Sequence, residues 1–147
     1  MFQSIYTAQA TATGGRDGHV TSSDQVLDLD VRVPREMGGA GGAYTNPEQL
    51  FAAGYAACFD SALNMITRMT KVKTGTTTVT ADVSIGKLES GGFGLAVVLN
   101  VNVPEVEQSV AEELVQKAHQ VCPYSNATRG NIDVSLTVTN HSGSVTV

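Results

Sequence analysis

The sequence is poor in positive charge and lacks long apolar runs. It has 9 Lys and Arg against 14 Asp and Glu, a formal net charge of -5. Nucleic-acid binding needs clustered positive charge, so this composition argues against a nucleic-acid partner. No apolar run approaches the ~20 residues of a membrane-spanning helix, and residues 1–6 show no secretory signal. We expect a cytoplasmic protein that acts on small molecules or proteins, without a membrane partner.

Cysteine is also scarce, with only Cys58 and Cys122 in 147 residues. A permanent structural disulfide is not expected in a reducing cytosol, so the two residues are free thiols, metal ligands or redox catalysts. Cysteine is also among the residues most often buried. A small core residue is therefore an equally good interpretation of either one taken alone.

The length fits one domain, 1–147. Short strands are predicted at 5–13 and 20–23, joined by a glycine-rich turn at 14–18. Apolar residues then alternate with polar ones over 26–33 and predict a strand with one buried face.

A long helix is predicted to begin at Asn46-Pro47-Glu48. Asn suits the N-cap, Pro the first helical position, and Glu the positive end of the helix dipole. The helix is expected to be largely buried, because its apolar residues leave little polar surface. These residues are Leu50, Phe51, Tyr55, Phe59, Leu63, Ile66 and Met69.

The second half predicts a hairpin over 76–88 and 95–103, a helix over 104–119 and a strand over 132–139, followed by a loose tail after Asn140. Strands and helices fall in blocks. This order favours the α+β class, with an antiparallel sheet packed on one or two helices.

The two cysteines occupy different local settings. Cys58 lies within the long helix among alanines and a glycine, whereas Cys122 ends the second helix, where Pro123 disfavours helical geometry. A fixed thiol and a mobile thiol suit a pair in which the first forms a sulfenic acid and the second closes a disulfide. Tight helix packing explains the small neighbours of Cys58 equally well, and the sequence does not show that the thiols meet.

A reactive thiol needs a cation, since only the thiolate is a good nucleophile. Arg16, among turn glycines, and Arg129 are the candidates, and Arg16 is the better one because its turn can aim it inward. An arginine in a turn is nevertheless more often simply exposed to solvent.

Two other chemistries deserve weighing. His119 and Cys122 have a metal-ligand spacing, but a structural zinc site needs about four ligands. A cysteine hydrolase could combine Cys58 with His19, His119 or His141, yet no nucleophile elbow surrounds Cys58.

Three segments resemble the organic hydroperoxide resistance (Ohr) branch of the OsmC/Ohr family: ATGGRDG at 12–18, TNPEQLFAAGYAACF at 45–59 and HQVCPYSNATRGNI at 119–132. The resemblance runs from about residue 6 to residue 138 and keeps the order and spacing of all three. Tyr44 departs from it, standing where a small residue is usual, and the tail 141–147 lies outside the pattern.

The resemblance implies an OsmC-like α+β fold, with antiparallel sheets packed around central helices in an intertwined homodimer that has two active sites near its interface. It implies a cysteine-based peroxidase that reduces alkyl and fatty-acid hydroperoxides to alcohols and serves organic peroxide resistance. No metal or organic cofactor is implied. The expected reductant is a dithiol of the lipoyl type, such as dihydrolipoamide, carried on lipoylated proteins.

The same resemblance assigns roles to four residues. Cys58 would be the peroxidatic cysteine, which becomes a sulfenic acid, and Cys122 the resolving cysteine, which forms a disulfide with it. Arg16 would stabilise the thiolate, and Glu48 would position Arg16. Competing functions are a peroxidase of the broader OsmC branch, and a module that binds hydrophobic ligands with inert thiols.

A collar of apolar residues could favour alkyl hydroperoxides, although core packing explains each of its members as well. The candidates are Phe51, Tyr55, Phe59, Met37 and Phe93.

The spacing of Glu48 and Cys58 raises a geometric problem. Ten residues of unbroken helix would separate them by about 15 Å along the axis. A direct cluster with Arg16 therefore predicts a break near 53–55, at Gly54, or a Glu48 supplied by the partner chain.

Overall fold

The computed structural model describes residues 1–142, whose contacts group into two compact units, Met1–Leu50 and Phe51–Val147. The first unit holds an antiparallel sheet in the order β1-β2-β3, formed by Ala10–Thr13, His19–Ser22 and Asp28–Asp30. The predicted hairpin is confirmed, with a first strand shorter than expected. The single domain expected over 1–147 stays a prediction.

The turn of this hairpin is a short 3-10 helix, η1 (Gly15–Asp17). Gly14 and Gly15 have φ of 78° and 57°, in the left-handed region that glycine adopts without steric cost. These glycines therefore allow the tight turn that carries Arg16.

The prediction that the strand over 26–33 buries one of its faces is wrong for the single chain. Leu27 and Leu29 are 45% and 37% exposed, and Val31 is the one buried hydrophobic side chain of residues 1–50. Val31 forms an isolated bridge with Thr45. The alternation is real, but no helix of this unit covers the face it creates.

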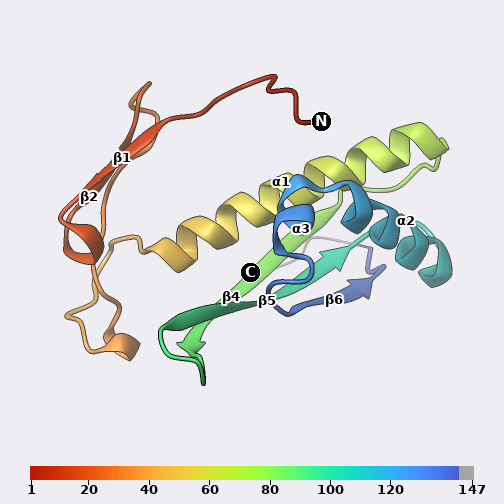
Figure 1. Cartoon of the computed structure of the whole chain (residues 1–147). Coiled ribbons are helices and arrows are strands. Elements are labelled where there is room, and N and C mark those ends of the chain that lie inside the picture. Colours follow the sequence, from red (N-terminus) through yellow and green to blue (C-terminus); the bar gives the residue numbers. More distant parts are fainter. Residues whose placement is uncertain (143–147) are drawn as a thin grey trace. The chain divides into compact units, whose positions relative to one another are not determined.

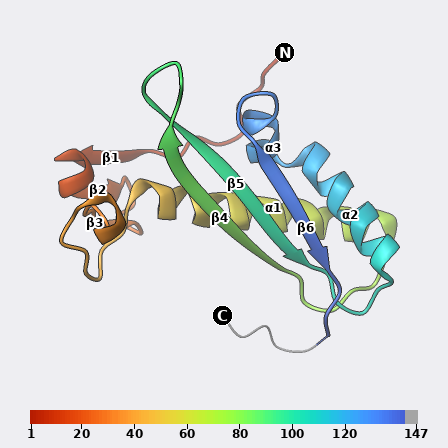
Figure 2. The same cartoon turned by 90° about the horizontal axis from the view of Figure 1, so that it is seen from below.

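The second unit contains a three-stranded sheet in the order β4-β5-β6, with helices on one of its faces (Figures 1 and 2). Its elements are most of α1 (Pro47–Thr70), then β4 (Thr78–Lys87), β5 (Phe93–Asn102), α2 (Gln108–Val121), α3 (Pro123–Thr128) and β6 (Val134–Thr139).

The sheet is mixed and not wholly antiparallel as predicted. β4 and β5 form the expected hairpin, whereas β6 pairs with β5 in parallel, from Val97 opposite Val134 to Asn102 opposite Thr139. A parallel pair requires a crossover, which α2 and α3 supply. The sequence predicted the last strand but not the direction in which it returns.

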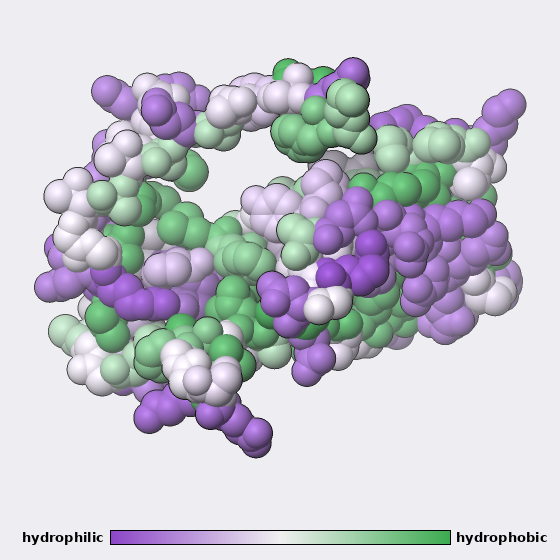
Figure 3. All heavy atoms as spheres, in the orientation of Figure 1, coloured by the Kyte–Doolittle hydropathy of each residue, from purple (hydrophilic) through white to green (hydrophobic). Residues whose placement is uncertain are grey.

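The core of this unit lies between α1, β5 and α2. Alternate residues of β5, Val97, Leu99 and Val101, are at most 2% exposed and pack with buried residues of both helices. The outer face of α2 is polar, and hydrophilic residues gather over it in Figure 3. Among residues 1–142, no helix is long and apolar enough to cross a membrane.

Helix α1 begins where the sequence predicts. The Asn46 Oδ1 accepts a hydrogen bond from the Gln49 N–H at 2.8 Å, which caps the first turn. The helix is buried along one face and not all round, since Met65 and Met69 are exposed. It runs without interruption to Thr70, so the break predicted near 53–55 is wrong.

The structure describes only the first residues of the loose tail predicted after Asn140. β6 ends at Thr139, and residues 143–147 lie outside the described residues.

Candidate active site

The structure brings the two cysteines together. The Cys122 Sγ lies 3.7 Å from the Cys58 Sγ, and both thiols are free. Cys122 is fully buried, while Cys58 is half-buried on α1. Sulfur atoms joined in a disulfide are about 2.05 Å apart, so closure requires an approach of about 1.7 Å.

Cys122 occupies the corner between two helices. It has φ -63° and ψ 124°, which ends α2 and, as predicted, takes this residue out of helical geometry before Pro123. Its N–H still donates to the Ala118 carbonyl at 2.9 Å, and its carbonyl accepts from the Asn126 N–H at 2.9 Å. Helix α3 starts at Pro123 and makes this corner a defined structure, which the sequence did not predict.

The protonation of Cys58 is set by opposing effects. Burial raises the pKa of the Cys58 thiol, the backbone N–H of Tyr124 lowers it, and the neighbouring Cys122 raises it, with a net upward shift. A thiol with a raised pKa is a poor nucleophile near neutral pH. The surroundings of Cys58 within its own unit therefore leave the thiolate in need of further stabilisation.

Gly54 has a packing role and does not break the helix. A Cβ at this position would lie 2.8 Å from the Tyr124 Oη and 3.2 Å from its Cε2, so a larger residue would force the ring to move. The Tyr124 ring also packs against Phe51 and Tyr55, with ring centroids 6.2 Å and 5.7 Å apart. The Tyr124 ring of α3 thus packs on α1 at Gly54, about one helical turn before Cys58.

Arg16 and Glu48 form a bidentate ion pair in the first unit. The Arg16 Nη1 and Nη2 donate to the two Glu48 carboxylate oxygens at 2.8 Å and 2.5 Å. These hydrogen bonds lower the pKa of Glu48 and raise that of Arg16. Glu48 lies in the first turn of α1, where the helix dipole favours a carboxylate.

The structure does not bring Glu48 and Cys58 together along α1. Because the helix is continuous, the ten-residue spacing places them about 15 Å apart along its axis. The other arrangement considered from the sequence, a Glu48 supplied by the partner chain, stays a prediction.

A buried polar cluster near the thiols was missed by the sequence analysis. The Tyr55 Oη lies 2.8 Å from the Ser125 Oγ and 3.2 Å from the Thr128 Oγ1, and the His119 Nδ1 lies 2.8 Å from the Ser125 Oγ. Tyr55 had been considered only as an apolar residue. The sequence did contain one signal for this cluster. Tyr55, His119 and Ser125 each lie three residues from a cysteine, and residues at that spacing share a helix face.

The arrangement of the histidines does not favour the alternative chemistries. His119 is bonded to Ser125, and His19 is bonded to Asp28 and Asp30, which raise its pKa. No group of three His, Cys, Asp or Glu side chains in residues 1–142 is arranged to hold a metal ion.

Of the five candidates for the apolar collar, two belong to the core and two are exposed. Tyr55 and Phe59 are fully buried, whereas Met37 and Phe93 are 42% and 68% exposed. Fully buried rings support the packing interpretation for Tyr55 and Phe59.

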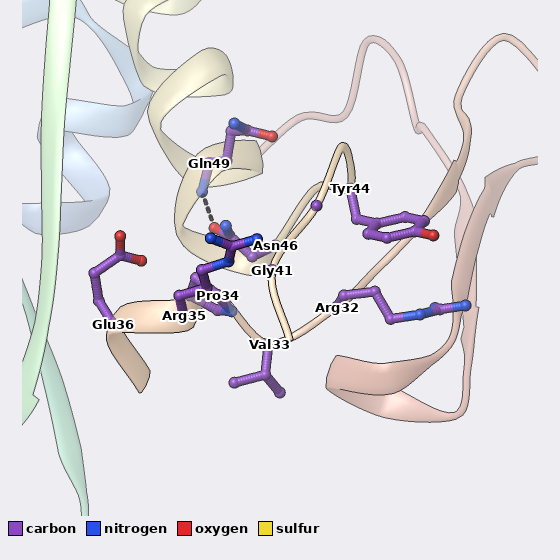
Figure 4. Close-up of a pocket in the computed structure, with 10 residues that line it drawn as sticks. Arg32, Val33, Pro34, Arg35, Glu36, Gly41, Tyr44, Asn46 and Gln49 are labelled. Carbon is purple, nitrogen blue, oxygen red and sulfur yellow. Dashed lines mark hydrogen bonds between the residues drawn. The ribbon is translucent and has the colours of Figure 1, made fainter. Parts of the chain in front are cut away.

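A cavity of about 280 Å³ lies within the first unit (Figure 4). Arg32 and Arg35 line it, but the Arg32 Nη1 donates to two backbone carbonyls and the Arg35 Nε donates to the Ala40 carbonyl. The Arg32 guanidinium also lies 5.0 Å from the centre of the Tyr44 ring. The Tyr44 ring therefore packs against a guanidinium that backbone carbonyls already hold in place.

Comparison with known proteins gives consistent matches. The family model described as OsmC-like protein matches residues 39–137. The organic hydroperoxide resistance protein of Xanthomonas axonopodis pv. citri is 56% identical over 135 residues, covering 91% of this chain and 94% of that protein. Organic hydroperoxide resistance protein OhrA of Bacillus subtilis is 54% identical over 144 residues, which cover 94% of this chain and 99% of that protein.

Among solved structures, an organic hydroperoxide resistance protein from Elizabethkingia anophelis superposes with a TM-score of 0.92. It is 61% identical and the match covers 95% of this chain and all of that chain. This similarity confirms the α+β, OsmC-like fold predicted from the sequence.

Proposed function

Because this chain belongs to the OsmC/Ohr family, we propose that it is a cysteine-based peroxidase that reduces organic hydroperoxides to alcohols and serves organic hydroperoxide resistance. The observation that carries the proposal is the pair of free thiols 3.7 Å apart, one fully buried and one half-buried. The names of the relatives supply the substrate class.

In this mechanism the Cys58 thiolate attacks the distal oxygen of the hydroperoxide. The O–O bond breaks, the alkoxide takes a proton and leaves as the alcohol, and Cys58 becomes a sulfenic acid. The Cys122 sulfur then attacks the Cys58 sulfur, and the sulfenic oxygen leaves as water. The two electrons that reduce the peroxide thus come from two thiols, and the product is a disulfide.

The thiolate requires a cation, and among the described residues no cation is one of the groups that shift the pKa of Cys58. Burial raises the pKa of Cys58, and the Tyr124 N–H offsets only part of this effect. We assign the cation to Arg16, oriented by Glu48, because their bidentate pair fixes the guanidinium in a half-buried turn. The continuous α1 favours an Arg16 and Glu48 from a second copy of the chain.

A homodimer is supported by the poor burial of residues 1–50. Their one buried hydrophobic side chain is Val31, while Phe2, Ile5 and Val26 are between 81% and 100% exposed. Large exposed apolar surfaces are typical of interfaces. We propose that a second copy covers them and brings its Arg16 to the thiols.

An external dithiol must then reopen the disulfide by thiol–disulfide exchange. We propose a lipoyl-type dithiol in the cytoplasm, carried on a lipoylated protein, on the strength of the family resemblance. Apart from this dithiol, the proposed chemistry uses the protein's own residues and requires no metal or organic cofactor.

The proposal is tested by a peroxidase assay coupled to dihydrolipoamide, with a panel of organic hydroperoxides and hydrogen peroxide. We expect turnover to be fastest with the organic hydroperoxides. Stopped-flow oxidation of the reduced protein by cumene hydroperoxide should consume both thiols. Equal rates with hydrogen peroxide would favour a peroxidase of the broader branch, and no loss of thiol would favour a ligand-binding module.

A further inference from the structure

Three of the hydrogen-bonded side chains near the thiols lie at the same spacing from a cysteine. Tyr55 precedes Cys58 by three residues on α1, His119 precedes Cys122 by three residues on α2, and Ser125 follows Cys122 by three residues on α3. Each of the three lies about one helical turn from a cysteine. The hydrogen bonds among them therefore connect the helix that carries one thiol to both helices that flank the other.

The bonds among these groups form one unbroken series, whose members are buried except for the half-buried His119. It runs from the His119 Nδ1 to the Ser125 Oγ at 2.8 Å, to the Tyr55 Oη at 2.8 Å and to the Thr128 Oγ1 at 3.2 Å. Tyr55 and Ser125 are 0% exposed and Thr128 is 5% exposed. The Thr128 hydroxyl ends the series by donating to the Ser125 carbonyl at 3.2 Å.

With the Thr128 proton assigned to this last bond, the directions of all the others follow. A carbonyl only accepts, so the single proton of the Thr128 hydroxyl points to it, and Thr128 must accept from Tyr55. Tyr55 then accepts from Ser125, and Ser125 accepts from His119. It follows that His119 carries its proton on Nδ1, and that every hydroxyl in the series donates once and accepts once.

We propose that this donor series positions Cys122 against Cys58 for disulfide closure, with His119 as its terminal donor. Cys122 lies at a corner where the chain leaves helical geometry, so its place relative to α1 depends on what holds α2 and α3. The series holds both helices to Tyr55, on α1. Its role in catalysis rests on the proposed function, whereas its geometry and its effect on closure do not.

Two neighbouring contacts support His119 as a fixed donor. The Arg129 Nη2 donates to the His119 backbone carbonyl at 2.6 Å, which anchors this turn of α2. Burial, assisted by the charge of Arg129, lowers the pKa of His119. The His119 ring is therefore neutral at any pH above the ordinary pKa of histidine. Protonation would keep the Nδ1–H, so the donor is present in both forms.

The first test measures the proton position directly, by ¹⁵N NMR of the reduced protein at about pH 8, above the ordinary histidine pKa. The His119 signals are identified by their loss in His119→Asn. We expect a protonated Nδ1 and a bare Nε2. A proton on Nε2 would reverse the bond to Ser125 and overturn the proposed direction.

The second test measures closure with diamide, which takes two electrons and two protons from the two thiols and becomes the hydrazine. No hydroperoxide is involved. Diamide first adds to one thiolate, and the second thiol then displaces it to form the disulfide, so trapping with iodoacetamide and mass spectrometry separates the two steps.

Tyr55→Phe removes only the hydroxyl and should slow the second step by up to about a hundredfold, the loss that a misplacement of about 1 Å can cause. The first step should keep its rate. The matched control is Ser61→Ala, also on α1, whose Oγ bonds only the Ala57 carbonyl of its own helix. Equal closure rates in Tyr55→Phe and Ser61→Ala would refute the positioning role.

An isosteric pair at His119 tests the donor itself and stays informative if Tyr55→Phe folds poorly. An asparagine amide can donate to Ser125, whereas an ionised aspartate can only accept. His119→Asn should close within about threefold of the wild-type rate, and His119→Asp should show the tenfold or greater loss that misplacement predicts. Equal rates for the two variants would remove the donor from the proposal.

Failure of this inference differs from failure of the proposed function. A protein that consumes no hydroperoxide, yet whose diamide closure follows the variant series, would retain the positioning role and lose the peroxidase function. A protein that reduces hydroperoxides, yet in which Tyr55→Phe forms no more sulfinic acid than the wild type under excess peroxide, would lose the positioning role alone.

Discussion

Replacing Gly54 by alanine sets two energies of similar size against each other. In the interior of a helix, alanine is more favourable than glycine by about 1 kcal/mol. The new Cβ would lie 2.8 Å from the Tyr124 Oη and 3.3 Å from its Cζ, too close for the ring to stay. Because Tyr124 is 39% exposed, its ring can swing toward solvent without a shift of the helix.

That movement breaks two aromatic contacts. The Tyr124 ring packs against Phe51 and Tyr55 with interplanar angles of 60° and 53°. Each such pair contributes about 0.5–1.5 kcal/mol, so the loss is about 1–3 kcal/mol. After subtraction of the helical gain, Gly54→Ala should lower the free energy of unfolding by about 0–2 kcal/mol.

The assay is urea denaturation of the reduced protein at a fixed protein concentration, since association would otherwise change the apparent stability. The control repeats Gly54→Ala in a Tyr124→Ala background, where the ring is absent. There the same substitution should raise the free energy of unfolding by about 1 kcal/mol. The double-mutant cycle should thus give a coupling of about 1–3 kcal/mol.

A gain of about 1 kcal/mol with Tyr124 in place would refute the reasoning, since it would show that the ring does not require glycine.

Three further predictions concern the proposed chemistry. Cys58→Ser should abolish peroxide turnover, whereas Cys122→Ser should still consume one equivalent of hydroperoxide; equal residual activity would reject the assigned roles. Arg16→Ala should raise the pKa of Cys58, measured by thiolate absorbance at about 240 nm, and an unchanged titration would remove Arg16 from the mechanism. Arg16 holds the pKa of Glu48 below its ordinary value. The ion pair therefore stabilises the folded protein at every pH above that ordinary pKa, and this stabilisation is lost as the pH falls through the lowered pKa. The difference in melting temperature between wild type and Arg16→Ala should therefore shrink below about pH 4, and a difference independent of pH would contradict the ion pair.

Local patterns predicted the elements well where the signal lies within a few residues. The start of α1 at Asn46 and Pro47 follows from capping, which involves only the first turn. The exit of Cys122 from helical geometry follows from the sterics of Pro123. The two hairpins follow from alternation and glycine-rich turns.

Gly54 shows where this reasoning fails. A glycine within a helix is compatible with a break and with close packing, and sequence cannot separate the two. The partner that decides is Tyr124, 70 residues away in the chain, whose ring occupies the place of a side chain. The break was predicted to bring Glu48 to Cys58, and the continuous helix removes that route.

The sequence by itself determined that two thiols lie on different helices, and its family resemblance named them as a pair. Only the tertiary structure decided that they lie 3.7 Å apart and that Cys122 is the more deeply buried. It alone revealed the donor series through Tyr55 and Ser125. Such contacts join segments more than 60 residues apart, and they depend on how whole helices pack, which no short-range pattern encodes.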